Sequence, residues 1–210
     1  MMKNSTSIRV CGIEKLDKGK YRICFETGIH CLVYGYEIRG MKLEEDAYIS
    51  EEQYQHILNE IVGKRAKKRA MHLLERMDRT EQQLREKLTS SEYPEQCVED
   101  AISYVKSFHY LDDLRYAENF TRYAKEKLSR QQIKQKLMSK GVSGELIDNA
   151  IESEYDAEES LHIRRLLEKK HFDRERCDDG EFRRVYQYLL RRGFRSNDIL
   201  KEMKSYQEPF

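Results

Sequence analysis

The sequence predicts a mainly α-helical protein: three tandem three-helix repeats in a curved, elongated array, preceded by a small domain that contains a β-hairpin. One sequence pattern recurs twice further along the chain, and a short N-terminal stretch alternates as strands do. Hydrophobic residues make up 39% and charged residues 37% of the 210 residues, which favours a surface-rich shape over one thick core. We expect an N-terminal part over residues 1–62 and repeats over residues 63–113, 114–156 and 157–210.

The N-terminal part reads as strands. Residues 7–11 are consistent with a short strand, and in residues 20–26 alternate side chains are apolar. Thr27 and Gly28 supply a tight turn, after which residues 29–34 continue as a second strand. A hairpin alone is marginally stable, so it must pack against another element.

The rest of the chain reads as helices. Ser50 and Gln53 form a capping-box pattern that starts the first long helix. Apolar stripes at helical spacing then predict the leading helix of each repeat, over residues 66–77, 114–128 and 159–170. We attribute these stripes to core packing, so function is expected on the charged faces.

The internal repeat is the most informative feature. Residues 83–88 align with residues 132–137 and with residues 184–189. Gly141 and Gly193 then share a column just after a helix, where a left-handed backbone often ends the helix. Glu92 holds this column in the first copy.

Catalytic and metal-binding patterns are weak, so no catalytic, cofactor or metal residue is predicted. The pair Asp112-Asp113 reads as a helix cap, and residues 178–180 read as a solvated turn within an inserted polar loop, residues 171–181. Six scattered histidines and five cysteines lack zinc spacing, and no phosphate-binding glycine loop occurs. The cysteines are expected to be reduced thiols.

Basic clusters are the stronger signal. The net charge is only +1, which argues for local patches. Each repeat carries one basic segment, and its recurrence suggests a shared face for an acidic protein or a phosphate backbone. In the third repeat Tyr186, Tyr188 and Phe194 interleave with the cations and are candidates for stacking on bases. The candidate binding residues are Lys64, Arg65, Lys67, Lys68, Arg69, Arg122, Lys125, Lys127, Arg130, Lys134, Lys136, Arg183, Arg184, Arg191, Arg192 and Arg195.

The helical part resembles the RecX family of bacterial regulatory proteins. Residues 76–81, followed by two leucines, are similar to the family's first-repeat pattern. Residues 107–113 are similar to its GYLDD signature, and residues 132–141 to its second-repeat pattern ending in Lys-Gly. The N-terminal hairpin is similar to the extension of Gram-positive members. His109 departs from the family, which usually has glycine there, and Glu92 stands where Lys-Gly is expected.

The resemblance implies a modulator of the RecA recombinase, a protein of homologous recombination, DNA repair and the SOS response. Such a protein lies along the groove of the RecA–single-stranded-DNA filament and limits filament growth, ATP hydrolysis, strand exchange and co-protease activity. It implies no enzyme activity and no cofactor. Single-stranded DNA is a second candidate contact.

Three alternatives remain open on the sequence. The first is a single-stranded nucleic-acid-binding protein without a dedicated protein target, and the second is a metal-dependent nuclease built on Asp112-Asp113. The third is a general protein scaffold. The absence of a signal sequence and of a long apolar run predicts a cytoplasmic protein that does not enter the membrane, and the expected array is a monomer.

Overall fold

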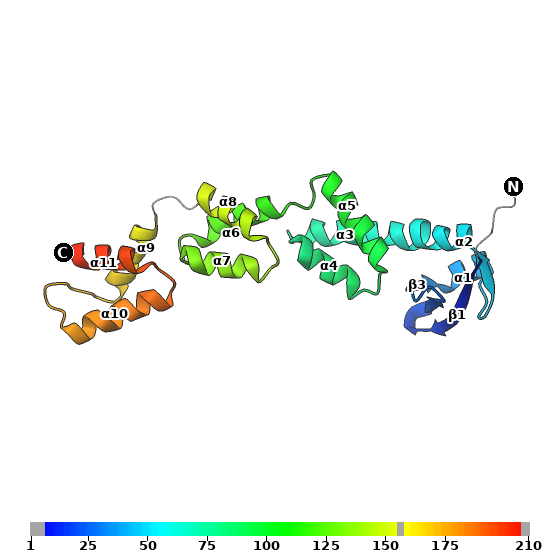
Figure 1. The fold of residues 1–210 in the computed structure, drawn as a ribbon, viewed down its shortest axis with the longest axis horizontal. Coiled ribbons are helices and arrows are strands. Elements are labelled where there is room, and N and C mark those ends of the chain that lie inside the picture. The colour runs from blue at the N-terminus through cyan, green and yellow to red at the C-terminus, as the bar shows by residue number, and fades with distance from the viewer. Residues whose placement is uncertain (1–6, 155–157, 207–210) are drawn as a thin grey trace. The chain divides into compact units, whose positions relative to one another are not determined.

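The computed structural model describes residues 7–154 and 158–206 of the chain (Figure 1). It divides into two compact units, Met1–Asp112 and Asp113–Phe210. The first unit combines an antiparallel sheet with helices, and the second is helical throughout its described residues. The predicted mainly helical class with a β-containing N-terminal part is therefore confirmed. None of the described helices is long and apolar enough to cross a membrane.

The sheet of the first unit has the strand order β3-β2-β1-β4. The predicted hairpin is present, because β2 pairs antiparallel with β3, and Gly28 in their turn has a φ of 81°. The first strand extends further than predicted, and β4 was not predicted. The strands are β1 (Ser7–Lys15), β2 (Lys20–Phe25), β3 (His30–Tyr34) and β4 (Tyr48–Ser50), with a short 3₁₀ turn, η1 (Asp17–Gly19), between β1 and β2.

A long helix covers the buried face of this sheet. It comprises α2 (Glu51–His56), the π-helical segment η2 (Ile57–Gly63) and α3 (Lys64–Arg76), with right-handed helical backbone at each junction. Ser50 caps its start with the predicted capping box. Residues of the sheet and of η2 belong to one buried apolar cluster, which supplies the packing that the hairpin needs. The short helix α1 (Gly35–Met41) lies between β3 and β4 in the chain.

The first repeat consists of α3, α4 (Glu81–Thr89) and α5 (Glu95–Ser107). Ala66, Ala70 and Leu73 on α3 are buried in the same apolar cluster as Leu84 and Leu88 on α4. These three positions of the predicted stripe are therefore core. Met77 is 58% exposed, because α3 ends at Arg76 and Met77 has an extended backbone, so the core position predicted for it is wrong. Leu161 of the third predicted stripe is likewise 54% exposed.

The second unit holds two further three-helix groups, each with its own buried cluster. Their helices are α6 (Asp113–Ala124), α7 (Arg130–Met138) and α8 (Gly144–Glu154), then α9 (Glu158–Lys169), α10 (Asp179–Arg191) and α11 (Ser196–Ser205). The second helix of every repeat begins at a polar cap whose side chain accepts a hydrogen bond from the third helical N–H. The caps are Thr80, Ser129 and Asp178.

The predicted left-handed column is present in all three repeats. Gly141 and Gly193 have φ values of 84° and 85°, and Glu92 has a φ of 61°. His109, which stands where the resemblance leads one to expect glycine, also has a positive φ, 57°. The backbone geometry is therefore retained where glycine is replaced, at some conformational cost.

The turn predicted for residues 178–180 is wrong. Asp178 caps α10, its side chain accepting a hydrogen bond from the Glu181 N–H over 2.6 Å, and Asp179 begins the helix. As a result α10 has 13 residues, whereas α4 and α7 have 9 each. Part of the predicted polar insertion therefore lengthens a helix.

Candidate interaction surface

Some cations in the basic segment of α3 pair with other residues of the fold, and others are exposed. Arg65 is half-buried: its guanidinium donates to both carboxylate oxygens of Glu37 at 2.9 Å and to the Leu32 carbonyl at 3.2 Å. Lys64 forms an ion pair of 2.7 Å with Glu60 on the preceding turn. Arg65 therefore ties α3 to α1 and to the exposed edge of the sheet.

Two other cations of α3 remain for a partner. Lys68 and Arg69 are exposed and form no ion pair with any residue that the structure describes. Lys67 lies with its Nζ 5.6 Å from the centre of the Tyr104 ring.

Three of the six candidate cations of the second repeat hold its helices together. Arg122 on α6 forms an ion pair with Glu154 at the end of α8, and Lys125 donates to the Glu154 carbonyl at 3.0 Å. Because of Arg122, the pKa of the Glu154 carboxyl lies below its usual range. Lys134 pairs with Asp148 at 2.6 Å.

Three more cations lie in or beside this repeat. Arg130 lies 3.6 Å from Glu159 of α9. Lys127 and Lys136 are exposed, and within residues 7–154 and 158–206 neither has an ion-pair partner.

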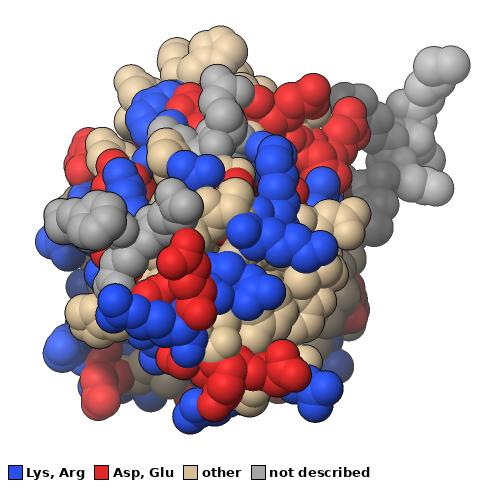
Figure 2. Space-filling view, turned by 90° about the vertical axis from the view of Figure 1, so that its left-hand side faces the viewer, with Lys and Arg blue, Asp and Glu red and all other residues tan. Residues whose placement is uncertain are grey.

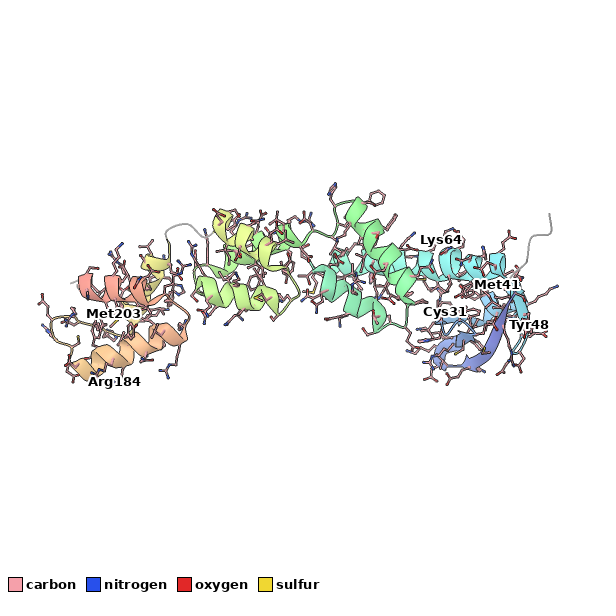
Figure 3. All side chains as sticks on the ribbon, viewed as in Figure 1. Cys31, Met41, Tyr48, Lys64, Arg184 and Met203 are labelled. Atoms are coloured by element: carbon pink, nitrogen blue, oxygen red, sulfur yellow. The ribbon has the colours of Figure 1, made fainter. Side chains whose placement is uncertain are left out.

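The candidate cations of the third repeat are the least engaged. Arg183, Arg184, Arg191 and Arg195 are exposed and make no ion pair with a described residue. Figure 3 shows Arg184 on the side of α10 away from α11, whereas Met203 lies between these two helices. Met203 of α11 is fully buried in the same apolar cluster as Val185 and Leu189 of α10, so the apolar face of α10 is distinct from its exposed arginines.

Two hollows flank Tyr188 on this repeat. One, of about 540 Å³, is lined by Lys170, Glu181, Arg183, Arg184, Val185, Gln187, Tyr188 and Arg191. The other, of about 530 Å³, is lined by Glu126, Lys127, His162, Arg165, Leu166, Glu168, Lys169, Tyr188 and Arg192. The Tyr188 ring lies between two cations, 4.7 Å from Lys170 Nζ and 5.3 Å from the Arg192 guanidinium carbon. We call the cations of both hollows, with Tyr188, the Tyr188 surface.

The three aromatic residues predicted to stack on bases differ in burial and in their contacts. Phe194 is 3% exposed and its ring packs edge-on against His162, so the stacking role predicted for it is wrong. Tyr186 is half-buried, with its hydroxyl 2.9 Å from the Ser196 hydroxyl. Tyr188 alone of the three lines the basic hollows.

Sequence reasoning missed the contribution of α9. Arg165, Lys169 and Lys170 line the hollows but were not among the candidates. The spacing of His162, Arg165 and Lys169, three and then four residues apart, places them on one helical face. That pattern was available in the sequence as a signal.

Acidic side chains lie among the basic ones on the third repeat. Figure 2 looks onto the C-terminal repeat and shows Asp and Glu side chains interspersed with Lys and Arg. The surface is therefore a set of local basic hollows, as the small net charge predicts. Among the described residues, no group of His, Cys, Asp and Glu side chains is arranged to hold a metal ion.

The first unit carries a separate exposed aromatic group. The Tyr104 and Phe108 ring centres are 5.0 Å apart, and Tyr110 follows at 6.2 Å from Phe108. These rings are 39%, 55% and 50% exposed, respectively. Together with Lys67 they offer a second surface of mixed aromatic and basic character.

Family models and curated relatives matched by this chain bear the name RecX. Residues 66–104 match the family model "RecX, first three-helix domain", and residues 112–151 match "RecX, second three-helix domain". The regulatory protein RecX of Caldanaerobacter subterraneus subsp. tengcongensis is 34% identical over 163 residues, covering 77% of this chain and 80% of that one. The regulatory protein RecX of Clostridioides difficile is 31% identical over 194 residues, 90% of each chain.

Solved structures share the fold. A crystal structure of regulatory protein RecX aligns with a TM-score of 0.64 at 23% identity, covering 95% of this chain and 100% of that one. The crystal structure of RecX from Lactobacillus salivarius aligns with a TM-score of 0.63 at 20% identity, covering 68% of this chain and 95% of that one.

The fold and the surface define a class: a helical-repeat protein with three-helix units and locally basic hollows. Identity above 30% over most of the chain makes the assignment specific. The chain belongs to the RecX family of regulatory proteins.

Proposed function

We propose that this protein binds along the groove of a RecA–single-stranded-DNA filament and limits filament growth, ATP hydrolysis, strand exchange and co-protease activity. It acts by binding, as a monomer in the cytoplasm, and carries out no catalysis of its own. The observation that carries the proposal is the regular repetition of one capped, left-handed-ended helix in three repeats of a RecX-family chain.

The repetition supports a filament as the partner. A filament presents the same surface at every protomer, and tandem repeats present similar surfaces at regular intervals along a chain. Successive repeats can therefore contact neighbouring protomers. A protein that bridges two protomers holds them in a fixed relation, which opposes the rearrangements that hydrolysis and strand exchange require.

The uneven engagement of the cations supports the Tyr188 surface as a principal contact. In the second repeat three of the six candidate cations already have acidic partners, whereas those of α10 have none among the described residues. Unpaired arginines that remain solvated are available to a phosphate or a carboxylate at no cost of breaking an internal pair.

The test is a comparison of affinities at one salt concentration. The fluorescently labelled chain is titrated with RecA filaments on single-stranded DNA and with the same DNA alone, and anisotropy is recorded. We expect tighter binding to the filament, saturating below one chain per RecA protomer. Equal or tighter binding to naked DNA would contradict a filament-specific role.

A matched pair of variants locates the contact. Arg184→Glu with Arg191→Glu changes the Tyr188 surface, and Lys201→Glu with Lys204→Glu makes the same charge change on exposed positions of α11. We expect the first pair to weaken filament binding and the second to leave it near wild type. Equal effects of the two pairs would mean that only total charge matters.

The second candidate function is binding of single-stranded nucleic acid without a protein target. The two basic hollows on either side of Tyr188 favour it, since phosphates and a stacked base suit this arrangement. It predicts a linear fall of log affinity with log salt for naked DNA, with a slope of about −0.7 per phosphate neutralised.

A further inference from the structure

The hollow between α9 and the C-terminal end of α10 is an electropositive site, and one residue in its wall is a buried histidine, His162. Lys127, Arg165, Lys169 and Arg192 line it, and so do Glu126 and Glu168. None of these six side chains forms an ion pair within the part of the chain that the structure describes. Four cations against two carboxylates give the lining a net charge of +2. Such a concave, positively charged surface attracts anions.

His162 lies at the wall of this hollow and is only 5% exposed. Its Nδ1 atom is buried and has no hydrogen-bond partner among the described residues. The ring packs edge-on against Phe194, with 5.2 Å between ring centres. A buried polar atom without a partner is rare in proteins, because it loses its hydrogen bonds to water and gains none, and it often marks a place for a ligand.

The charges around His162 oppose its protonation. Burial is the first cause that lowers the pKa of His162, and the cation Arg192, from the end of α10, is the second. Arg165 and Lys169, on α9 itself, lower this pKa further. The ring is therefore mainly neutral at pH 7.

Four further charged residues lie on the elements around His162. Lys127 and Glu126, from the segment after α6, and Glu168 of α9 line the same hollow. Glu202 of α11, which packs against α9, is held by Arg164 at 2.5 Å. The Glu202 carboxylate is therefore already paired with a cation of α9.

We propose that this hollow binds a phosphodiester group of single-stranded nucleic acid, and that His162 takes up a proton from solvent as the phosphate enters and becomes its hydrogen-bond donor. The long side chains of Arg165 and Lys169 change rotamer readily and can close around the anion. His162 lines the hollow, and once neighbouring side chains move to expose its buried Nδ1 atom, a phosphate in the hollow can accept a hydrogen bond from the ring. A proton on His162 raises the net charge of the lining from +2 to +3.

The proton uptake follows from electrostatics. A phosphodiester carries a negative charge that offsets the cations opposing protonation of the ring. The pKa of His162 must therefore rise on binding, and by linkage the affinity must rise as pH falls. Each unit by which this pKa rises makes binding tenfold tighter below both pKa values than above them.

The neighbouring hollow favours nucleic acid over an isolated carboxylate. It shares Tyr188 with the first and adds Lys170, Arg183, Arg184 and Arg191, so a chain of anions can continue from one hollow to the other. An aromatic ring between two cationic hollows matches alternating bases and phosphates. This inference does not rest on RecA as the partner, and its test contains no recombinase.

The test uses the full chain and an oligothymidylate. Affinity is measured at constant ionic strength from pH 8 to pH 5.5, and the pH titration of the His162 ring protons is followed by nuclear magnetic resonance with and without the oligonucleotide. We expect a higher pKa for His162 in the complex and about tenfold tighter binding at low pH for each unit of that rise. An unchanged pKa in the complex would overturn the proposal.

Two variants and one competitor sharpen the result. His162→Phe keeps a ring against Phe194 and should bind with a weaker pH dependence. His171→Asn, at an exposed position in the turn after α9, should keep the wild-type dependence. The same dependence in His162→Phe as in wild type would contradict the role of His162. Equal affinity and equal proton uptake with a polyglutamate peptide would contradict phosphate as the ligand.

Discussion

The hydroxyl of Ser129 donates a hydrogen bond to the carbonyl oxygen of Arg192 over 2.7 Å, joining the start of α7 to the end of α10. The Ser129 hydroxyl oxygen in turn accepts a hydrogen bond from the Gln132 N–H and so caps α7. Ser129 is fully buried, and Gly193 beside it leaves room, since a Cβ there would lie 3.0 Å from the Ser129 oxygen. One small side chain thus satisfies the ends of two helices in different repeats.

We expect Ser129→Ala to destabilise the second unit by about 2–3 kcal/mol, because it removes a cap and leaves a buried carbonyl without its donor. Ser50→Ala is the matched control. Ser50 has the same capping box, its side chain makes no hydrogen bond to another repeat within the described residues, and its loss should cost about 1 kcal/mol. Hydrogen exchange of the α7 and α10 amides measures the difference. Equal losses in the two variants would show that the Arg192 contact adds nothing.

The π-helical segment η2 has a strict requirement for glycine. A Cβ at Gly63 would lie 2.9 Å from the carbonyl oxygen of Leu58, which also accepts from the Cys97 thiol at 3.3 Å. Gly63→Ala should therefore destabilise the first unit by about 1–3 kcal/mol, although alanine favours helices. Gly40→Ala, with open space around its Cβ, should be neutral or slightly stabilising. Urea denaturation compares them, and a stable Gly63→Ala variant would contradict the crowding.

Arg65 is expected to stabilise the fold. Arg65→Ala leaves the carboxylate of Glu37, whose side chain is 12% exposed, without its cation, and should cost about 2–4 kcal/mol. Lys68→Ala, on the exposed side of the same helix, should change stability by less than about 0.5 kcal/mol. Thermal unfolding followed by circular dichroism gives both values. Similar midpoints for the two variants would mean that the ion pair contributes no net stability.

The second unit should lose stability in mild acid. The pKa of His162 is lower in the folded chain than its ordinary value of 6.5, so its stabilising contribution is present above pH 6.5 and is lost as pH falls through the lowered pKa. Burial raises the pKa of Glu159, which acts in the opposite direction as pH falls. The difference between wild type and His162→Phe isolates the histidine. That difference should diminish from pH 7 to pH 5, and a constant value would contradict it.

The repeat architecture was predictable because it depends on local signals. Capping residues and apolar spacing mark each helix, and the column shared by Gly141 and Gly193 marks where one ends. Glu92 takes the same left-handed backbone, so the position within the repeat predicts the helix end better than the residue type does. The strand β4 escaped prediction because it has three residues and is defined by pairing with β1.

The candidate site was predictable only in part, because charge is visible in a sequence and burial is not. Phe194 lies among exposed arginines along the chain, yet it is core, since it follows the left-handed turn at Gly193. The helical spacing of His162 with Arg165 and Lys169 was visible in the sequence, but the burial of His162 beside cations that other elements supply was not. Arg65 is basic like its neighbours, and only the fold reveals its bond to Glu37.

The most direct test of the proposed function is the rate of ATP hydrolysis by RecA on single-stranded DNA, measured with this protein at ratios well below one chain per RecA protomer. The account predicts a marked fall in rate, retained by Lys201→Glu with Lys204→Glu and weakened by Arg184→Glu with Arg191→Glu. An unchanged rate, alongside tight binding of the chain to the DNA alone, would contradict it and favour a nucleic-acid-binding protein without a recombinase partner.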